Sequence, residues 1–258
     1  MIQSVGRAAR ILKALGSESA RLGVTELAER LGLAKATVHG LLRTLEAHQL
    51  VEQDLETGKY RLGPALLQLG NAFLDNNELR ARSLLWAETL AGRAREAVHV
   101  GVLYGPNVLL VHHVFRPDNS LQILQVGASI PWHACALGKA SVAYLEPQAQ
   151  AELLAGPLPR LTGRTLTVKA ALQAELEAVV DTGVAVEDQE AIVGEGGIAA
   201  ALFDNRGAVV GAIGLAGPVE RLLPDGPAAD AVAAVKEAAR GLSRELGAGR
   251  PALPGTGA

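Results

Sequence analysis

Residues 33–45 (LAKATVHGLLRTL) combine basic, small and apolar side chains at helical spacing. Helical periodicity places four apolar side chains on one side of this segment: Val38, Leu41, Leu42 and Leu45. On the opposite side or at the start lie six others: Lys35, Ala36, Thr37, His39, Gly40 and Arg43. This second face has two cations and no acid, and its small residues suit close approach to a phosphate backbone and a groove. A solvated helix face is the alternative interpretation for one such helix alone.

His133 and Cys135 form a second candidate pair, because a histidine base can activate a thiol nucleophile. Side chains two apart at a helix start seldom share that geometry, and no third, orienting residue is evident. We therefore expect no catalytic residue and no enzymatic activity. For Cys135 we prefer a small residue at a helix start whose free N–H groups face a cavity, which favours an anionic or hydroxylated small ligand.

The remaining histidines and acids do not indicate a metal site. His112 and His113 are adjacent on an expected strand, so their side chains point to opposite faces and cannot hold one ion together. The single cysteine excludes an internal disulfide and a cysteine-based zinc site. Glu187, Asp188 and Glu190 form an acidic cluster, either in a solvated loop or beside a ligand. We expect no metal ion and no cofactor.

The elements that position residues 33–45 form a helical head. Residues 4–15 are amphipathic at helical period and predict a first helix. Residues 25–31 predict a second helix, with Thr25 as its N-terminal cap. Gly32 allows the positive φ of a tight turn, so the segment reads helix, turn, helix.

A short hairpin follows the helices. Residues 50–53 and 59–62 are the expected strands, with Gly58 at a left-handed position in the turn. A hairpin after a helix-turn-helix is the winged form of the DNA-binding fold. Lys59 and Arg61 on this wing can then reach phosphate or the minor groove.

The charge distribution fits an N-terminal DNA-binding domain, the head, joined to a second domain of another kind. Residues 1–62 hold nine Lys or Arg and seven Asp or Glu, although the whole chain of 258 residues has a net charge of −3. The size and the 49% hydrophobic content suit one large or two medium domains. No apolar run is long enough for a membrane span and no signal peptide is evident, so we expect a cytoplasmic protein without a membrane partner.

A linker helix is expected from Pro64, which suits the first helical position. Its apolar side chains are Leu66, Leu67, Leu69 and Phe73. They can pack on the helical head or on a second subunit, and we favour the second subunit.

The second half of the chain alternates strands with helices. Residues 79–95 predict a helix with Leu84, Leu85 and Leu90 directed inward. Three further helices are expected: residues 134–145, a helix capped by Thr167 and ended by Gly183, and residues 227–246. Six strands are expected: residues 97–103, 108–115, 121–126, 184–187, 197–204 and 208–216.

Six segments together resemble the IclR family of bacterial transcription regulators. They are SVGRAARILKAL, TELAERLGLAKATVHGLLRTLE, VEQDLETGKYRLGPALLQLG, PWHACALGKASVAYL, GVAVEDQEAIVGEGGIAAALFD and VVGAIGLAGPVERL. The match is collinear from Ile2 to Gly247.

The resemblance implies an α+β protein. Its parts are a winged helix-turn-helix domain (1–63), a linker helix (64–77), a GAF-like effector domain with a mostly antiparallel sheet (78–248) and a disordered tail (249–258). It further implies a regulator, expected to repress, that binds a double-stranded DNA operator as a homodimer or tetramer.

The resemblance also implies where a small-molecule effector binds. The matching positions are Cys135, Ala136, Leu137, Gly138, Glu187, Gly197, Gly214 and Ala216. Relatives often carry Asp, Cys and Ser where this chain has Glu187, Gly197, and Gly214 with Ala216. A carboxylate accepts hydrogen bonds from hydroxyls, which favours a small polyol or its phosphate.

A closer resemblance within the family, in residues 34–45, 76–91 and 107–124, favours glycerol or glycerol 3-phosphate as the effector. The alternatives are a regulator that senses an organic or aromatic acid and, more remotely, a thiol enzyme with an appended DNA-binding head. Only 3% of the residues are aromatic, which argues against a flat aromatic pocket.

Overall fold

A computed structural model describes residues 2–17, 21–118, 122 and 124–249. The chain forms two compact units, Met1–Asn76 and Asn77–Ala258, and each is described by itself. No helix in the described ranges is long and apolar enough to cross a membrane. The expected tail falls outside these ranges except for Gly249.

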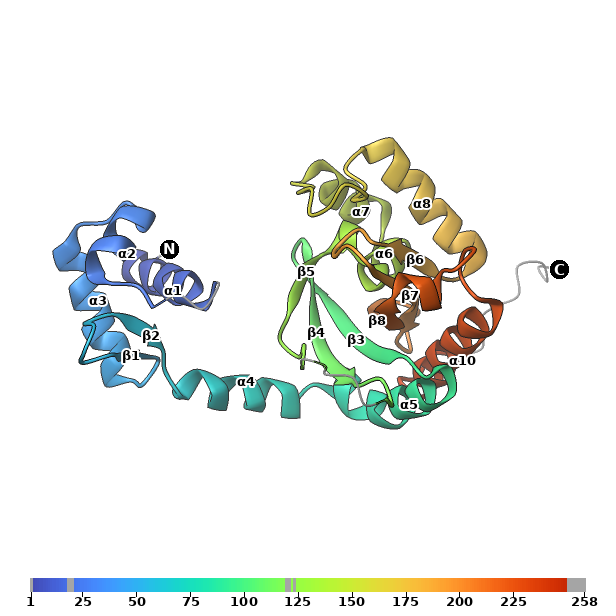
Figure 1. The fold of residues 1–258 in the computed structure, drawn as a ribbon, viewed down its shortest axis with the longest axis horizontal. Coiled ribbons are helices and arrows are strands. Elements are labelled where there is room, and N and C mark those ends of the chain that lie inside the picture. Colours follow the sequence, from blue (N-terminus) through green and yellow to red (C-terminus); the bar gives the residue numbers. More distant parts are fainter. Residues whose placement is uncertain (1, 18–20, 119–121, 123, 250–258) are drawn as a thin grey trace. The chain divides into compact units, whose positions relative to one another are not determined.

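The first unit is a three-helix head with a wing (Figure 1). Its helices are α1 (Gln3–Gly16), α2 (Val24–Leu31) and α3 (Lys35–Ala47), and the antiparallel strands β1 (Val51–Gln53) and β2 (Tyr60–Leu62) form the wing. Apolar side chains of all these elements meet in one buried cluster that includes Ile11, Leu27, Val38, Leu42 and Tyr60. The predicted winged helix-turn-helix fold is confirmed.

The turns of the head lie where the sequence predicts them, but the start of α2 does not. Gly32 and Gly58 have φ values of +65° and +67°, as predicted. The predicted cap at Thr25 is wrong, because α2 begins one residue earlier and Gly23 occupies the cap position. The Glu26 carboxylate accepts a hydrogen bond from the Gly23 backbone N–H at 2.6 Å, so the third residue of the helix bonds back to the cap position.

The linker helix α4 (Ala65–Asp75) has no buried residue within its own unit. Pro64 occupies the cap position rather than the first helical position. Leu67, Leu69 and Phe73 are 69%, 61% and 52% exposed. The helix therefore carries an apolar surface that the first unit does not cover.

The second unit is built on a six-stranded sheet in the order β5-β4-β3-β8-β7-β6, with antiparallel neighbours throughout. The strands are β3 (Ala97–Tyr104), β4 (Asn107–Val114), β5 (Ser129–Pro131), β6 (Ala185–Asp188), β7 (Glu195–Phe203) and β8 (Val209–Pro218). The helices are α5 (Glu78–Ala94), η1 (Trp132–Ala134), α6 (Ala136–Val142), α7 (Pro147–Ala155), α8 (Lys169–Thr182), α9 (Val219–Leu222) and α10 (Ala229–Glu245).

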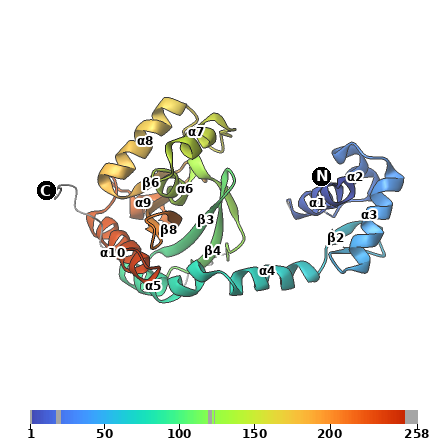
Figure 2. The same cartoon turned by 180° about the vertical axis from the view of Figure 1, so that it is seen from behind.

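The two faces of this sheet pack against different helices (Figures 1 and 2). Helices α5 and α10 cover one face. The other face carries Ala185, Ala199 and Ala212, which share a buried cluster with residues of α6 and α8 such as Leu137 and Leu176. The mostly antiparallel sheet and the α+β class are as predicted.

Some predicted details of the second unit are wrong. Leu90 is buried, but Leu84 and Leu85 are 43% and 74% exposed, because they lie on the side of α5 away from the sheet. Val168, rather than Thr167, precedes α8, and Gly183 ends that helix in a left-handed conformation as predicted.

The predicted helix over 134–145 is present but shorter: α6 covers Ala136–Val142, and the chain is extended at Cys135 between η1 and α6. Of the predicted strand over 121–126, residues 121 and 123 lie outside the described residues and the rest are not in a strand. Strand β5, three residues further on, pairs with β4 instead. Helices α7 and α9 were not predicted.

Candidate DNA-binding surface and effector site

The polar face of α3 is exposed as its sequence predicts. Lys35, His39 and Arg43 recur every four residues and are all exposed, so they lie along one side of the helix. Ala36 and Gly40 lie exposed beside them, and Thr37 is half-buried. On the inner side Val38, Leu42 and Leu45 are buried, whereas Leu41 is only half-buried.

Ion pairs distinguish the helix cations from the wing cations. On the wing, Lys59 Nζ lies 3.2 Å from Glu26 Oε1 and Arg61 Nη2 lies 2.9 Å from Glu52 Oε2. Lys35 and Arg43 form no ion pair with the residues that the structure describes. The two cations of α3 are therefore the more available for an external phosphate.

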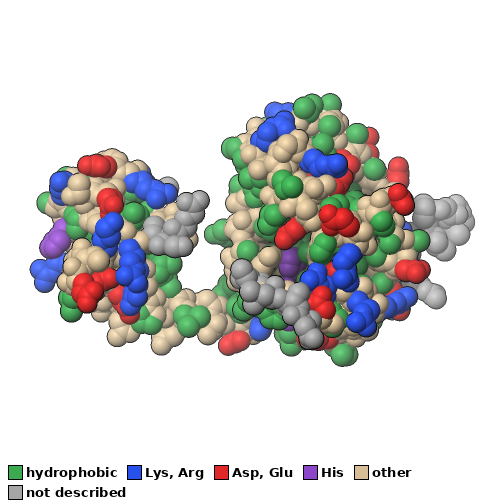
Figure 3. All heavy atoms as spheres, viewed as in Figure 1, with side chains coloured by type: hydrophobic (Ala, Val, Ile, Leu, Met, Phe, Trp, Pro, Cys, Tyr) green, Lys and Arg blue, Asp and Glu red, His purple; other side chains and the backbone are tan. Residues whose placement is uncertain are grey.

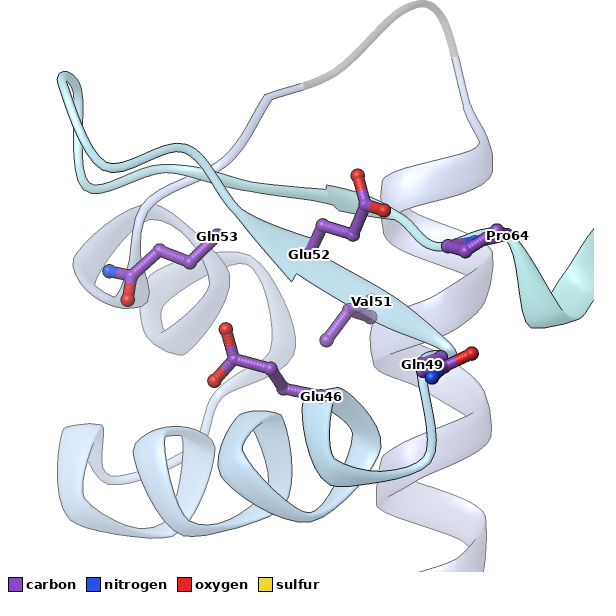
Figure 4. A pocket seen from close by; sticks show the side chains of 6 residues that line it. All are labelled: Glu46, Gln49, Val51, Glu52, Gln53 and Pro64. Atoms are coloured by element: carbon purple, nitrogen blue, oxygen red, sulfur yellow. The ribbon is translucent and has the colours of Figure 1, made fainter.

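The C-terminal end of α3 is acidic and borders a hollow of about 490 Å³. Six residues line it: Glu46, Gln49, Val51, Glu52, Gln53 and Pro64 (Figure 4). Glu46 and Glu52 make this hollow unsuited to phosphate. Figure 3 shows acidic and basic side chains interspersed over the head, so net charge alone does not mark a binding face. The candidate DNA-binding surface is the part of α3 from Lys35 to Arg43.

Cys135 in the second unit is not an activated nucleophile. Burial raises the pKa of its thiol to about 12, and a hydrogen bond from the Gly138 backbone N–H opposes that shift. His133 Nε2 lies 3.0 Å from the Pro159 carbonyl oxygen, so His133 is engaged away from the sulfur. The two residues do not form the base–nucleophile pair.

Close packing explains why a glycine, Gly138, occupies the first turn of α6. A Cβ atom at Gly138 would lie 2.2 Å from the Trp132 carbonyl oxygen, so only glycine fits there. Ala136 and Leu137 are almost completely buried against the sheet. These residues position the start of α6 above the strands.

Glu187 is the buried carboxylate of this region. Its Oε1 accepts hydrogen bonds from the backbone N–H groups of Glu190 and Ala191 at 2.6 and 3.2 Å. Burial raises the pKa of Glu187 to about 7, although these hydrogen bonds act in the opposite direction. The Cβ position of Gly197 lies 3.5 Å from Glu187 Oε2 and 3.4 Å from Ala136 Cβ, so these three residues come together.

The sheet register arranges the other expected effector residues. Glu187 pairs with Gly197, and Gly197 pairs with Ala216, so all three share the face that meets α6. Gly214 lies opposite Ala199 on the same face, and a Cβ atom there would lie 2.6 Å from Ala199 Cβ. Gly214 is therefore a packing position and offers no side-chain hydrogen bond.

The other two acids of the expected cluster turn to different partners. Asp188 pairs with Arg164. Glu190 Oε1 lies 2.6 Å from Nζ of Lys139, a fully buried lysine that the sequence did not predict as part of the site. The sequence around Lys139 does not mark it as buried, because the residues of α6 do not divide into a polar and an apolar face.

The chain as a whole matches two known domain families. The family described as "IclR helix-turn-helix domain" matches residues 4–55. The family described as "Bacterial transcriptional regulator IclR C-terminal" matches residues 71–244, more than half of the chain.

The chain belongs to the IclR family.

Relatives of this IclR-family protein match over nearly their full lengths. The "Glycerol operon regulatory protein" of Streptomyces griseus is 49% identical over 96% of this chain and 98% of that protein. The protein of the same name from Streptomyces coelicolor is 46% identical over the same shares. The solved IclR regulator of Alicyclobacillus acidocaldarius is 28% identical, with a TM-score of 0.81 over 96% of this chain and 100% of that one. The protein is a DNA-binding transcription regulator and not an enzyme.

The buried carboxylate gives this IclR-family protein a testable pH dependence. The pKa of Glu187 is about 7 in the folded protein and 4.5 in its ordinary state, so the folded state binds this proton more tightly. The stabilisation that comes from protonated Glu187 is fully present below pH 4.5 and is lost as the pH rises to 7. Glu187→Gln keeps an acceptor for the two backbone N–H groups but does not titrate. We therefore expect this variant to lack the pH-dependent decrease in the free energy of unfolding, which amounts to up to about 3 kcal/mol in wild type.

Urea unfolding at pH 5 and pH 8 measures this effect. The free energy of unfolding of Glu187→Gln minus that of wild type should be larger at pH 8 than at pH 5. A difference that is the same at both pH values would contradict the assignment of the titration to Glu187.

Proposed function

We propose that this protein binds the operator of an operon for glycerol use and that glycerol or glycerol 3-phosphate controls its DNA affinity. The observation that carries the operator-binding part is the exposed row of Lys35, His39 and Arg43, whose two permanent cations have no ion-pair partner in the described head. The glycerol part is supported by the two Streptomyces relatives, which are named for a glycerol operon. Operator binding would place the protein in the cytoplasm.

The effector would bind where α6 meets the sheet. Glu187 offers one acceptor oxygen beside Gly197 and Ala136, and the neighbouring strand positions are glycine or alanine. The start of α6 supports an anion less strongly than the sequence suggests, because the Gly138 N–H interacts with the Cys135 sulfur. Hydroxyl groups bonded to Glu187 are therefore the better supported part of the recognition.

Control of DNA binding requires unequal effector affinities. A ligand changes the DNA affinity only if it binds the DNA-competent and incompetent arrangements with different free energies. Two heads presented by a dimer would read half-sites about 34–36 Å apart, or a multiple of that distance. We propose that the protein acts as a repressor in this way.

A DNA-binding titration tests the proposal. The full chain is titrated against the upstream region of its own operon at fixed salt, without ligand and then with glycerol, glycerol 3-phosphate or benzoate. We expect salt-dependent binding that one of the first two compounds changes and benzoate does not. A response to benzoate alone would reject the glycerol assignment, and absence of salt-dependent binding to duplex DNA would reject the operator assignment.

Assembly should depend on the uncovered apolar surface of α4. We propose that it packs against a second copy of the chain in a homodimer or tetramer. Leu66→Glu or Leu69→Glu would bury an unpaired charge in that interface, at a cost of about 3–5 kcal/mol of association. Gln68→Glu adds the same charge on the polar side of the helix and serves as the control.

Sedimentation velocity over a range of concentrations measures the effect. The two leucine variants should dissociate at concentrations where wild type and Gln68→Glu remain associated. Leucine variants that sediment as unchanged oligomers would exclude α4 from the interface.

A further inference from the structure

Both cations of the wing are paired with acids. Residues 51–62 contain two basic side chains, Lys59 and Arg61. Lys59 Nζ lies 3.2 Å from Oε1 of Glu26 in α2, and Arg61 Nη2 lies 2.9 Å from Oε2 of Glu52 in β1. The wing therefore has the cations of a DNA-binding element, but neighbouring acids cancel their charge.

The backbone fixes the Glu26 carboxylate independently of Lys59. Glu26 Oε2 accepts the Gly23 backbone N–H at 2.6 Å, while Oε1 accepts from Lys59. This N–H and then the lysine lower the pKa of Glu26, so the carboxylate is charged at neutral pH. The lysine side chain is long and can swing, whereas the acid stays at the start of α2. The negative charge therefore remains near the wing even when the ammonium group moves toward a phosphate.

The strand register fixes Glu52 beside Arg61. The two residues lie directly opposite each other on the antiparallel strands β1 and β2. Glu52 Oε2 lies 3.0 Å from Nε and 2.9 Å from Nη2 of Arg61. The four side chains of the two pairs are between 41% and 54% exposed, so water screens the attraction within each pair. The cations can exchange partners, but each acid still cancels one positive charge of the wing.

A third pair beside the wing has the same arrangement. Asp54 Oδ2 lies 2.8 Å from Arg21 Nη1. Asp54 Oδ1 accepts the backbone N–H groups of Glu56 and Thr57, so this acid also shapes the turn of the wing. Substitution of Asp54 would change the turn as well as the charge, whereas the acids of the first two pairs lie outside it.

Local net charge determines how strongly the wing binds a DNA backbone. Neutralisation of phosphates by cations releases counterions, and this term supplies nearly all of the binding to random sequences. A head on random DNA is not held by base contacts and can turn to use any exposed cation. A head on the operator is fixed by its base contacts, so only cations that meet phosphate in that one orientation contribute. Unmasked wing cations would therefore favour random DNA over the operator.

We propose that Glu26 and Glu52 increase the preference of this regulator for its operator over random DNA, because they cancel the charge of Lys59 and Arg61. The wing then adds little to non-specific binding, which depends mainly on the exposed cations of α3. The inference rests on the proposed binding of the operator by the head.

The variant Glu26→Gln/Glu52→Gln tests the proposal in the full chain. Glutamine at position 26 can still accept the Gly23 N–H, and thermal unfolding checks that the variant is folded. Affinities are measured between 0.05 and 0.3 M salt for two duplexes. One is the upstream region of the protein's own operon, and the other is a scrambled sequence of the same length and composition.

For the scrambled duplex, the slope of log K against log salt should become steeper by up to about 1.8 per head. Its affinity at 0.15 M salt should rise about five- to 30-fold per head. The operator affinity should rise at least about threefold less, so that the ratio of the two affinities falls. Glu78→Gln/Glu237→Gln removes two acids that pair with arginines in the second unit and is the matched control, which should change neither affinity.

Further substitution of the wing cations separates masking of these cations from direct repulsion of phosphate by the acids. A fourfold variant adds Lys59→Gln and Arg61→Gln to the double variant and has the net charge of wild type. It should bind the scrambled duplex with the wild-type slope, because the gain in the double variant comes from the freed cations. A fourfold variant that keeps the gain would show that the acids act on phosphate directly, and would overturn the proposal.

Two other results would also contradict the proposal. One is a double variant with wild-type affinity and slope for the scrambled duplex, and the other is an equal gain on both duplexes. Either result would leave operator binding by the head intact. Absence of salt-dependent binding of wild type to duplex DNA would instead reject the operator assignment, and this inference with it.

Discussion

Lys139→Met should destabilise the protein by about 3–5 kcal/mol, because it leaves a buried carboxylate without its cation. Lys139 is fully buried, and its Nζ lies 2.6 Å from Glu190 Oε1 and 3.4 Å from Glu175 Oε2. The Glu190 side chain is only 7% exposed, and its Oε2 has no hydrogen-bond partner in the described structure. Methionine fills a similar volume, so the loss is mainly electrostatic.

The double variant Lys139→Met/Glu190→Gln provides the control. It removes both charges, and it should recover most of the lost free energy of unfolding. Burial already raises the pKa of Glu190, and Lys139 opposes that shift. Without the lysine Glu190 should protonate more readily, so the destabilisation by Lys139→Met should be smaller at pH 5 than at pH 8.

Urea unfolding of the single and double variants at both pH values measures these effects. A double variant as unstable as Lys139→Met would show that the lysine acts through its packing rather than through the ion pair.

The pairing of His99 with His113 illustrates what the sequence could not provide. The turn of the β3–β4 hairpin pairs Tyr104 with Asn107, and counting back along regular strands would place His112 opposite His99. A bulge at Val100/Gly101 shifts the register by one residue and brings His113 there instead. The alternation predicted the strands, but the inserted residue decides which histidine faces α6.

The head was more predictable because its interactions are local. Helical periodicity identified Val38, Leu42 and Leu45 as buried and left Lys35 and Arg43 exposed. Gly32 and Gly58 marked the turns, because both need positive φ.

Other features depend on partners distant in sequence, and sequence patterns did not reveal them. The break at Cys135 accompanies the approach of Gly138 to the Trp132 backbone. Lys139 is buried because it meets Glu190, which lies 51 residues further along the chain.

Lys35→Ala/Arg43→Ala should have the largest effect on function, because it removes both exposed cations of the candidate DNA-binding surface. Each phosphate contact lowers the slope of log K against log salt by about 0.9. At 0.15 M salt the loss of two contacts corresponds to about 30-fold in affinity for one head, and to about a thousandfold for two heads bound together. If one of the residues contacts a base instead, its loss should also relax the sequence preference.

Two control variants separate this effect from a general change in charge. Arg82→Ala/Arg93→Ala removes the same charge from α5, where both arginines pair with glutamates, and it should leave the salt slope unchanged. Lys59→Ala/Arg61→Ala should have a smaller effect than the α3 variant, because the wing cations already pair with Glu26 and Glu52. Operator affinities measured between 0.05 and 0.3 M salt give all the slopes. An α3 double variant with wild-type affinity and slope would mean that α3 does not contact DNA.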